Sequence, residues 1–225
     1  MDAVPSAYER VLEAVGSAVV AGELPVGAVD TVDRIESRTG ASRSIVREAV
    51  RVLVGLGLLT AGRRVGLTVC PRDQWNVLDP RVIRWRLRSD REDQLLELLE
   101  LRRAVEPAAA RQAAERRTDD EAERLRSIAD ELRAAAGLGG SAFLEADRQL
   151  HRAMLRASGN ALFVRLGGVI DEALRDRAEG EQAIARPASR DVALHGLMAA
   201  AIADADAEGA EAAMREIVEL TDPTP

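Results

Sequence analysis

Glycine and proline divide the 225 residues of the chain into two parts that must fold differently. Up to about residue 78 they recur every few positions, which leaves room only for short helices and strands. From Arg91 onward, long stretches rich in alanine, leucine, glutamate and arginine are interrupted at residues 118–119, 137–140, 159–160, 186–187 and 207–209. This spacing predicts about six helices of about 12 to 24 residues with short connections, which together form a helical bundle.

The composition agrees with a mainly helical protein. Hydrophobic residues make up 47% of the chain but aromatic residues only 2%, and the alternating apolar runs of a β-sandwich or barrel are missing. The single Cys70 excludes a disulfide framework and a four-cysteine zinc site. The first ten residues lack a leader pattern, and no apolar stretch approaches the roughly 18 residues of a membrane span. We therefore expect a cytosolic, cytoplasmic protein.

The net charge of −7 is the sum of two unequal parts. All 31 basic residues are arginines: residues 1–89 carry 13 of them and 10 acidic residues, a net of +3, whereas residues 90–225 carry 18 and 28, a net of −10. The bulk charge argues against a protein coated in positive charge, but the first part can face a polyanion such as DNA. Ordinary solubility explains the same asymmetry, so charge alone does not decide.

Residues 31–59 carry the pattern of a helix-turn-helix. In a helix over residues 41–59, one arc of about 100° collects the apolar positions Val46, Ala49, Val50 and Leu53. Arginines at positions 43, 47 and 51 form a neighbouring stripe. Ser42 is placed to cap this helix, so that backbone N–H groups and arginines point to one region. A second short helix over residues 31–39 and a glycine-bearing turn complete the motif.

The segment that follows predicts a β-hairpin. Residues 58–60 and 67–69 are short β-prone runs, and the tip between them carries Arg63, Arg64 and Gly66. Glycine at such a tip lets the backbone approach DNA closely, and arginine can bind phosphate or enter a minor groove. A plain helical subdomain with solvated arginines is the alternative that the residues leave open.

These motifs resemble the winged helix-turn-helix of GntR-type transcription regulators. The similarity rests on residues 22–27 (GELPVG), 39–53 (TGASRSIVREAVRVL) and 66–69 (GLTV), and it extends over about the first 75 residues. Many family members carry a basic residue where this chain has Asp33, so we expect Arg34 or Arg38 to supply that contact. The resemblance implies that operator DNA is contacted by Arg34, Arg38, Ser42, Arg43, Arg47, Arg64 and Gly66.

In the second part, a helix over residues 142–157 places charged groups on its inward face. Phe143, Leu150 and Met154 define the apolar stripe, and Asp147 and His151 lie on the same stripe. An unpaired buried charge costs several kcal/mol, so these two side chains need partners. They can pair with each other, or they can share a metal or an anionic ligand.

His195 is the only other histidine of the chain. In a helix over residues 191–205 it shares a face with Asp191, Met198, Ala199 and Ile202. Because both histidines then point into the bundle, we expect them to meet at one site.

The second part resembles the FCD effector-binding domain of the FadR subfamily of GntR regulators. The similarity rests on residues 101–114 (LRRAVEPAAARQAA), 147–151 (DRQLH), 157–160 (ASGN) and His195, and extends from about residue 90 to 220. It implies that Asp147, His151 and His195 bind a divalent metal, zinc or nickel, and that Arg102 and Asn160 help to bind the effector. Arginine suits this task because its guanidinium binds a carboxylate with two hydrogen bonds.

The fourth ligand of the family is missing from this chain. Metal-binding members place another histidine on the last helix, where this chain has Ile217. Three protein ligands can still hold zinc when water or effector oxygens complete the shell, with lower affinity. Without a metal, the triad of Asp147, His151 and His195 would bind the effector directly together with Arg102.

We therefore expect a mainly α protein in three parts: a winged helix-turn-helix domain at residues 1–75, a linker with a short helix at 76–89, and an FCD-like antiparallel bundle for effector binding and dimerisation at 90–221. Residues 75–85 and 98–107 look most like sugar-acid operon repressors of the galactonate type. The expected function is a homodimeric repressor that a small carboxylate or sugar acid releases from operator DNA.

Three alternatives are less consistent with the residues. An acyl-CoA effector needs a long apolar tunnel without inward aspartate and histidine. A metal-dependent hydrolase would lack an obvious general base and would have no use for a winged helix. A constitutive architectural DNA binder would leave the inward Asp147 and His151 unexplained.

Overall fold

The computed structural model describes residues 5–62, 65–138, 140–179 and 188–220, which are mainly helical, as the sequence predicts. The chain divides into two compact units, Met1–Gln94 and Leu95–Pro225. Each unit has its own cluster of buried apolar side chains. None of the described helices is both long and apolar enough to cross a membrane.

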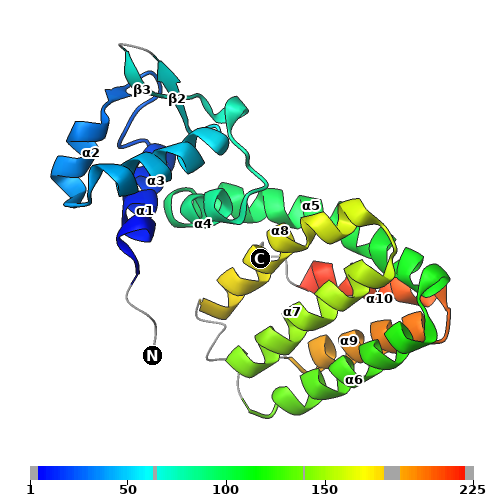
Figure 1. Cartoon of the computed structure of the whole chain (residues 1–225). Helices are drawn as coiled ribbons and strands as arrows, with labels where there is room; N and C mark the ends of the chain where they lie inside the picture. Colours follow the sequence, from blue (N-terminus) through cyan, green and yellow to red (C-terminus); the bar gives the residue numbers. More distant parts are fainter. Residues whose placement is uncertain (1–4, 63–64, 139, 180–187, 221–225) are drawn as a thin grey trace. The chain divides into compact units, whose positions relative to one another are not determined.

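The first unit is a winged helix-turn-helix (Figure 1). Its elements are α1 (Ala7–Val20), β1 (Val29–Asp30), α2 (Val32–Thr39), α3 (Arg43–Gly55), β2 (Leu59–Gly62), β3 (Gly66–Val69), the short 3-10 helix η1 (Arg72–Gln74) and α4 (Pro80–Ser89). The sheet order is β1-β3-β2 with antiparallel pairs, and Leu59 lies opposite Val69. The expected hairpin is therefore present, and β1 adds a strand that the sequence did not predict.

Local chemistry explains where α2 and α3 begin and end. Thr31 caps α2 by accepting a hydrogen bond from the N–H of Arg34 at 3.2 Å. Gly40 ends this helix with φ +66°, a left-handed conformation that glycine adopts without steric cost. The predicted apolar arc of α3, which comprises Val46, Ala49, Val50 and Leu53, is buried. The helix-turn-helix is therefore held in place by its own core.

The segment 76–89, which we expected to be a linker with a short helix, contains the helix α4, and α4 packs against α1 within the first unit. Trp85 of α4 is buried, and its indole N–H donates a hydrogen bond to Glu13 Oε2 at 2.8 Å. Arg88 forms an ion pair with the other oxygen of Glu13 at 2.6 Å. These contacts attach α4 to the first compact unit, which extends to Gln94.

The second unit is a helical bundle whose described part contains six helices (Figure 1). They are α5 (Arg91–Arg116), α6 (Asp119–Ala135), α7 (Gly140–Ala157), α8 (Ala161–Glu179), α9 (Ser189–Ala203) and α10 (Ala207–Leu220). α6 packs on α7 and α9, α7 on α8, and α9 on α10. Fully buried alanines at 109, 110 and 113 join α5 to the same core. The site described next lies among these helices.

Candidate functional site

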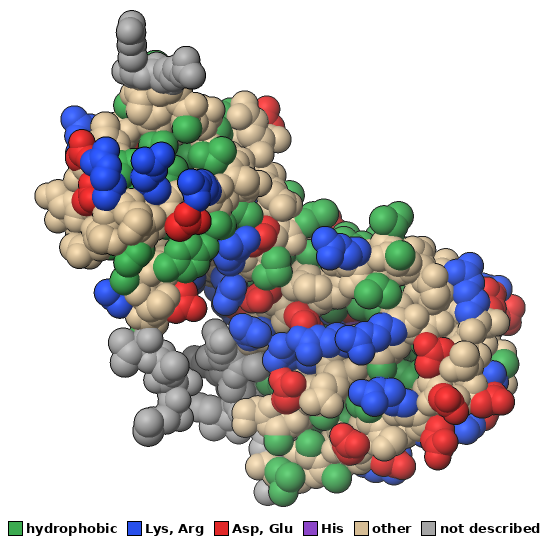
Figure 2. Space-filling view, viewed as in Figure 1, with side chains coloured by type: hydrophobic (Ala, Val, Ile, Leu, Met, Phe, Trp, Pro, Cys, Tyr) green, Lys and Arg blue, Asp and Glu red, His purple; other side chains and the backbone are tan. Residues whose placement is uncertain are grey.

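A group of buried charged side chains lies inside the second unit. Asp147 and His151 lie on α7, and their spacing of four residues places both on one helix face. His195 comes from α9, and all three side chains are at most 1% exposed. In Figure 2 no histidine is visible on the face shown, in keeping with this burial. The structure therefore brings the two histidines of the chain together, as the sequence predicts.

Three potential ligand atoms converge within this group. Asp147 Oδ1 lies 2.8 Å from His195 Nε2 and 3.2 Å from His151 Nε2, and the two imidazole centroids are 5.6 Å apart. These contacts are ion pairs when the imidazoles are protonated, but none of the three atoms makes a hydrogen bond of regular geometry within the part of the chain that the structure describes. Buried polar atoms are rarely left in this state unless something else binds them. This buried triad could hold a metal ion.

The other nitrogen of each imidazole has a partner that can only accept a hydrogen bond. His151 Nδ1 lies 2.7 Å from Glu106 Oε1, and His195 Nδ1 lies 2.8 Å from the backbone carbonyl oxygen of Asp191. Because a carboxylate and a carbonyl only accept, Nδ1 of each ring carries a proton and donates it. In the neutral rings the lone pair is then on Nε2, which faces Asp147. Both rings are thus oriented as metal ligands are.

Glu106 is in turn paired with Arg102 on the same helix. The Arg102 Nε–H donates a hydrogen bond to Glu106 Oε2 at 2.9 Å, and both side chains are buried. The sequence singled out Arg102 as an effector contact but assigned no role to Glu106. The available signal was their spacing of four residues, which places both on one face of α5.

The buried groups keep one another charged. Burial alone would raise the pKa of Asp147, but the positive charges of His195 and His151 outweigh it and hold that pKa well below its usual value. Burial would lower the pKa of His195, but the negative charges of Asp147 and Asp191 raise it to about 10. The pKa of His151 is raised in the same way by Glu106 and Asp147. Despite burial, Arg102 and His151 lower the pKa of Glu106.

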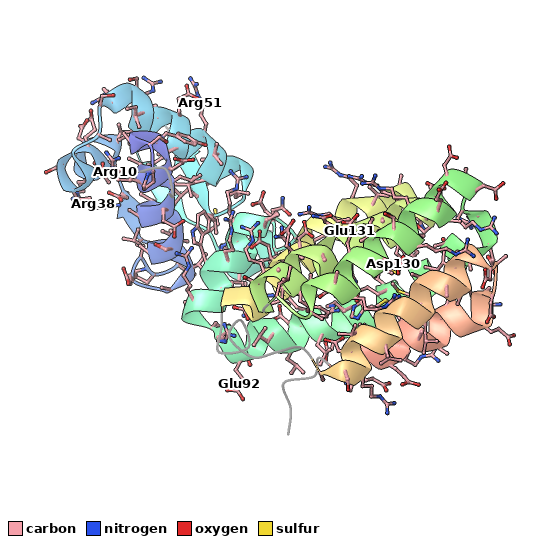
Figure 3. The ribbon with its side chains drawn as sticks, turned by 90° about the horizontal axis from the view of Figure 1, so that it is seen from below. Arg10, Arg38, Arg51, Glu92, Asp130 and Glu131 are labelled. Atoms are coloured by element: carbon pink, nitrogen blue, oxygen red, sulfur yellow. The ribbon has the colours of Figure 1, made fainter. Side chains whose placement is uncertain are left out.

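Two further positions that the sequence analysis considered for the site, Ile217 and Asn160, have other surroundings. Ile217 of α10 is fully buried among apolar side chains, so the fourth family ligand has no replacement at that position. Asn160 lies before α8, where its Oδ1 accepts a hydrogen bond from the N–H of Leu162 at 3.0 Å. This capping contact accounts for Asn160 without an effector. In contrast to the buried carboxylates of Asp147 and Glu106, the acidic side chains of Asp130 and Glu131 on α6, labelled in Figure 3, are exposed on the surface.

The predicted DNA-contacting residues of α3 lie at its exposed N-terminal end. Ser42 occupies the N-cap position, but its Oγ lies 3.1 Å from Ser44 Oγ and makes no capping hydrogen bond. Arg43 forms ion pairs with Asp33 and, at 3.4 Å, with Glu36. Arg47 is exposed and makes no ion pair with any residue that the structure describes. Figure 2 shows arginine side chains on the surface of this unit.

The remaining predicted contacts of the first unit have structural partners. Arg38 forms an ion pair with Asp30 at 2.5 Å, and Arg34 Nη1 donates to the carbonyl oxygen of Val29 at 3.4 Å. Gly66 has φ +97°, and a Cβ there would lie 2.7 Å from the backbone oxygen of Asp30, so the backbone itself requires glycine. Arg64 lies outside the described residues.

Comparison with known proteins agrees with the fold of both units. Residues 97–220 match the FCD domain family. The chain is 33% identical over 169 residues to the galactonate operon transcriptional repressor of Escherichia coli (strain K12), covering 74% of this chain and 73% of that protein. It is 31% identical over 148 residues to a protein of Paenarthrobacter nicotinovorans named a probable D-xylose utilization operon transcriptional repressor, covering 65% and 57%.

A solved structure agrees with these relatives. GntR from Streptococcus agalactiae is similar with a TM-score of 0.54 and 22% identity, over 94% of this chain and 97% of that one. The likeness supports a winged helix-turn-helix combined with a helical bundle. The FCD match covers more than half of the chain, and the named relatives are transcription regulators rather than enzymes. The chain therefore belongs to the GntR family of DNA-binding transcription regulators, in the branch that carries an FCD domain.

Proposed function

We propose that this regulator is a homodimeric repressor that releases its operator when a small sugar acid or related hydroxycarboxylate binds to a divalent metal in the FCD domain. Asp147, His151 and His195 hold the metal. The observation that carries the proposal is the convergence of three buried ligand atoms that make no hydrogen bonds. The relative named a galactonate operon repressor supports the class of effector.

The chemistry of the ligand atoms favours zinc or nickel. Two imidazoles and one carboxylate suit borderline metals of this kind, whereas magnesium and calcium prefer sites made of oxygen ligands alone. When bound, the metal supplies a strong positive charge to which a carboxylate and a neighbouring hydroxyl can bind. The apolar Ile217 provides no ligand, so water or the effector fills the remaining positions. Arg102 is our further candidate for the effector carboxylate.

The effector must favour one arrangement of the protein over another. A ligand shifts an equilibrium only by its differential affinity for the two states, so it has to bind the DNA-incompetent state more tightly. On the DNA side, we propose that Arg43 and Arg47 of α3 contact the operator, with Arg34, Arg38, Ser42, Arg64 and Gly66 in supporting positions. Positive charge and exposure at the start of α3 support this assignment.

A metal-binding measurement tests the site itself. Purified protein is stripped with a chelator, and binding of Zn²⁺ and Ni²⁺ is followed by calorimetry for the wild type, Asp147→Asn and Glu145→Gln. Glu145 is the matched control because it lies on the same helix but is half exposed and pairs with Arg148. We expect one equivalent of metal in the wild type and in Glu145→Gln, and none in Asp147→Asn. Equal binding by all three would rule out the site.

A ligand screen tests the effector class. Thermal shift with a panel of sugar acids, run with and without metal, should find a compound that stabilises the loaded protein and loses its effect in His195→Gln. The same compound should release operator DNA in a mobility-shift assay. A flat screen on metal-loaded, DNA-binding protein would refute the effector class while leaving the metal site intact.

A further inference from the structure

The carboxylate of Glu106 joins two buried groups that lie on different helices. Its Oε1 lies 2.7 Å from His151 Nδ1 on α7, and its Oε2 accepts a hydrogen bond from Arg102 Nε on α5 at 2.9 Å. The side chain is fully buried. Each oxygen therefore serves one partner, and the charged carboxylate is compensated on both sides.

The two imidazoles of the triad are oriented in different ways. Nδ1 of His195 donates to the backbone carbonyl of Asp191, four residues earlier in the same helix, and the carboxylate Oδ1 of the same residue lies 3.2 Å from Nδ1, so both acceptors come from the helix of His195 itself. The residue at the corresponding position before His151 is Asp147. Its carboxylate lies at Nε2 of His151, on the other side of the ring from Nδ1. The acceptor for Nδ1 of His151 is supplied by a side chain of another helix, Glu106. The orientation of His151 thus depends on one residue.

We infer that Glu106 is a positioning residue that fixes His151 with Nε2 toward the metal, and that Arg102 holds Glu106 in place. This inference rests on the proposed metal site. A carboxylate hydrogen-bonded to a ligating histidine fixes the ring and increases its basicity, and loss of such a partner typically lowers metal affinity by about 10- to 100-fold. Arg102 thus acts on the metal through Glu106 and His151.

Two substitutions separate the hydrogen bond from the charge. Glu106→Gln keeps an acceptor oxygen for Nδ1 but removes the negative charge, whereas Glu106→Leu removes both. Glu115→Gln is the matched control, because Glu115 lies on the same helix and pairs with Arg111 at the same spacing of four residues, but at an exposed position. The control removes the charge of an equivalent ion pair without touching the buried group.

The test follows zinc affinity and the histidine rings in the full-length protein. Because the chain has two histidines, the ring nitrogens of ¹⁵N-histidine-labelled protein give two sets of signals, and His195→Gln assigns them. We expect Kd for Zn²⁺ to rise at least tenfold in Glu106→Leu and less in Glu106→Gln, and to stay unchanged in Glu115→Gln. The zinc-loaded wild type should show a proton on Nδ1 of His151, and Glu106→Leu should lose the downfield shift of that proton.

Several outcomes would overturn the inference. Unchanged zinc affinity in both Glu106 variants would do so, as would a metal on Nδ1 of His151 in the wild type. Should Glu106→Leu fail to fold, Glu106→Met takes its place, because it also removes the acceptor for Nδ1, and unchanged affinity with an unchanged His151 proton shift in that variant contradicts the assignment. Should the wild type bind no metal at all, the proposed function fails. The Nδ1 proton of His151 in the metal-free protein then still tests the contact to Glu106.

Discussion

The indole ring of Trp85 lies directly against the backbone of Gly16. A Cβ added at Gly16 would lie 2.6 Å from Cζ3 of the ring and closer still to two further ring atoms. Real Cβ atoms essentially never show such contacts. The close approach of α1 and α4 therefore depends on a glycine at this point.

Gly16→Ala should destabilise the first unit. The tryptophan is buried and its indole N–H is held by Glu13, so the added methyl group forces a shift that costs about 1 to 3 kcal/mol. Gly55→Ala is the matched control: it also lies in a helix, but a Cβ there meets nothing within 4 Å. Because Gly55 is the last residue of α3, the control should change stability by no more than about 0.5 kcal/mol. Urea unfolding monitored by tryptophan fluorescence distinguishes the two, and equal stability would contradict the contact.

Arg47→Ala should abolish operator binding while leaving stability within about 0.5 kcal/mol of the wild type, as for a surface substitution. The side chain is exposed on α3 and has no ion pair to lose within the described residues. Arg51→Ala, one turn later and already paired with Glu48, serves as the control and should bind more nearly like the wild type. Fluorescence anisotropy with operator DNA measures both, and full binding by Arg47→Ala would remove α3 from the interface.

Asp33→Asn should increase affinity for DNA of unrelated sequence. The carboxylate of Asp33 contacts Arg43, so it competes with phosphate for that guanidinium and repels the DNA backbone. Its loss should tighten nonspecific binding several-fold and steepen the salt dependence by about one counterion. Glu48→Gln removes a similar exposed partner of Arg51 and should have a smaller effect. Weaker binding by Asp33→Asn would mean that Asp33 orients Arg43 instead of competing for it.

Metal uptake should release protons, and zinc affinity should rise with pH. The pKa of His195 is raised from 6.5 to about 10, so this ring is protonated near neutral pH in the metal-free protein, and the pKa of His151 is raised in the same direction. Zinc requires neutral imidazoles and must displace these protons. Calorimetry in buffers of different ionisation enthalpy counts the protons released. A pH-independent affinity between pH 6.5 and 9 would contradict the charged state of the site.

The raised pKa of His195 also determines the direction in which the stability of the metal-free protein changes with pH. In the metal-free protein, the raised pKa of His195 contributes stability that is fully present below about pH 6.5 and is lost as the pH rises toward 10. The lowered pKa of Asp147 contributes stability that is present above its ordinary value and is lost only in acid. Thermal melts of chelated protein should therefore show a falling melting temperature in the alkaline range. Zinc should reduce this fall, because it replaces the lost positive charge.

The local and the rare features of the chain could be predicted from sequence. The apolar arc of α3 was visible because helical periodicity is a property of neighbouring residues, and Gly40 marked the turn through its backbone freedom. The meeting of His151 with His195 could be predicted because the chain has two histidines and both lie on core stripes. Because histidine is rare in this chain, the patterns of two separate helices predicted one shared site.

The features that the sequence did not reveal are pairings between distant residues. Nothing in residues 80–89 indicates that Trp85 contacts Glu13 and Gly16 on α1, because an amphipathic face does not determine which helix packs against it. The strand β1 has only two residues, and it is recognisable as a strand through its pairing with β3. Glu106 was visible as a neighbour of Arg102, but its contact to His151 crosses between helices separated by 45 positions in the chain.

Because Ile217 offers no ligand atom, the proposed site would hold its metal ion through three protein side chains. An ion held by fewer protein atoms is released more readily, so its occupancy would follow the free metal concentration in the cell and the supply of an oxygen-rich metabolite together. Each would strengthen the binding of the other. Such a regulator would act as a coincidence detector, and a cell starved of the metal would keep the operon silent even when the carbon source is present.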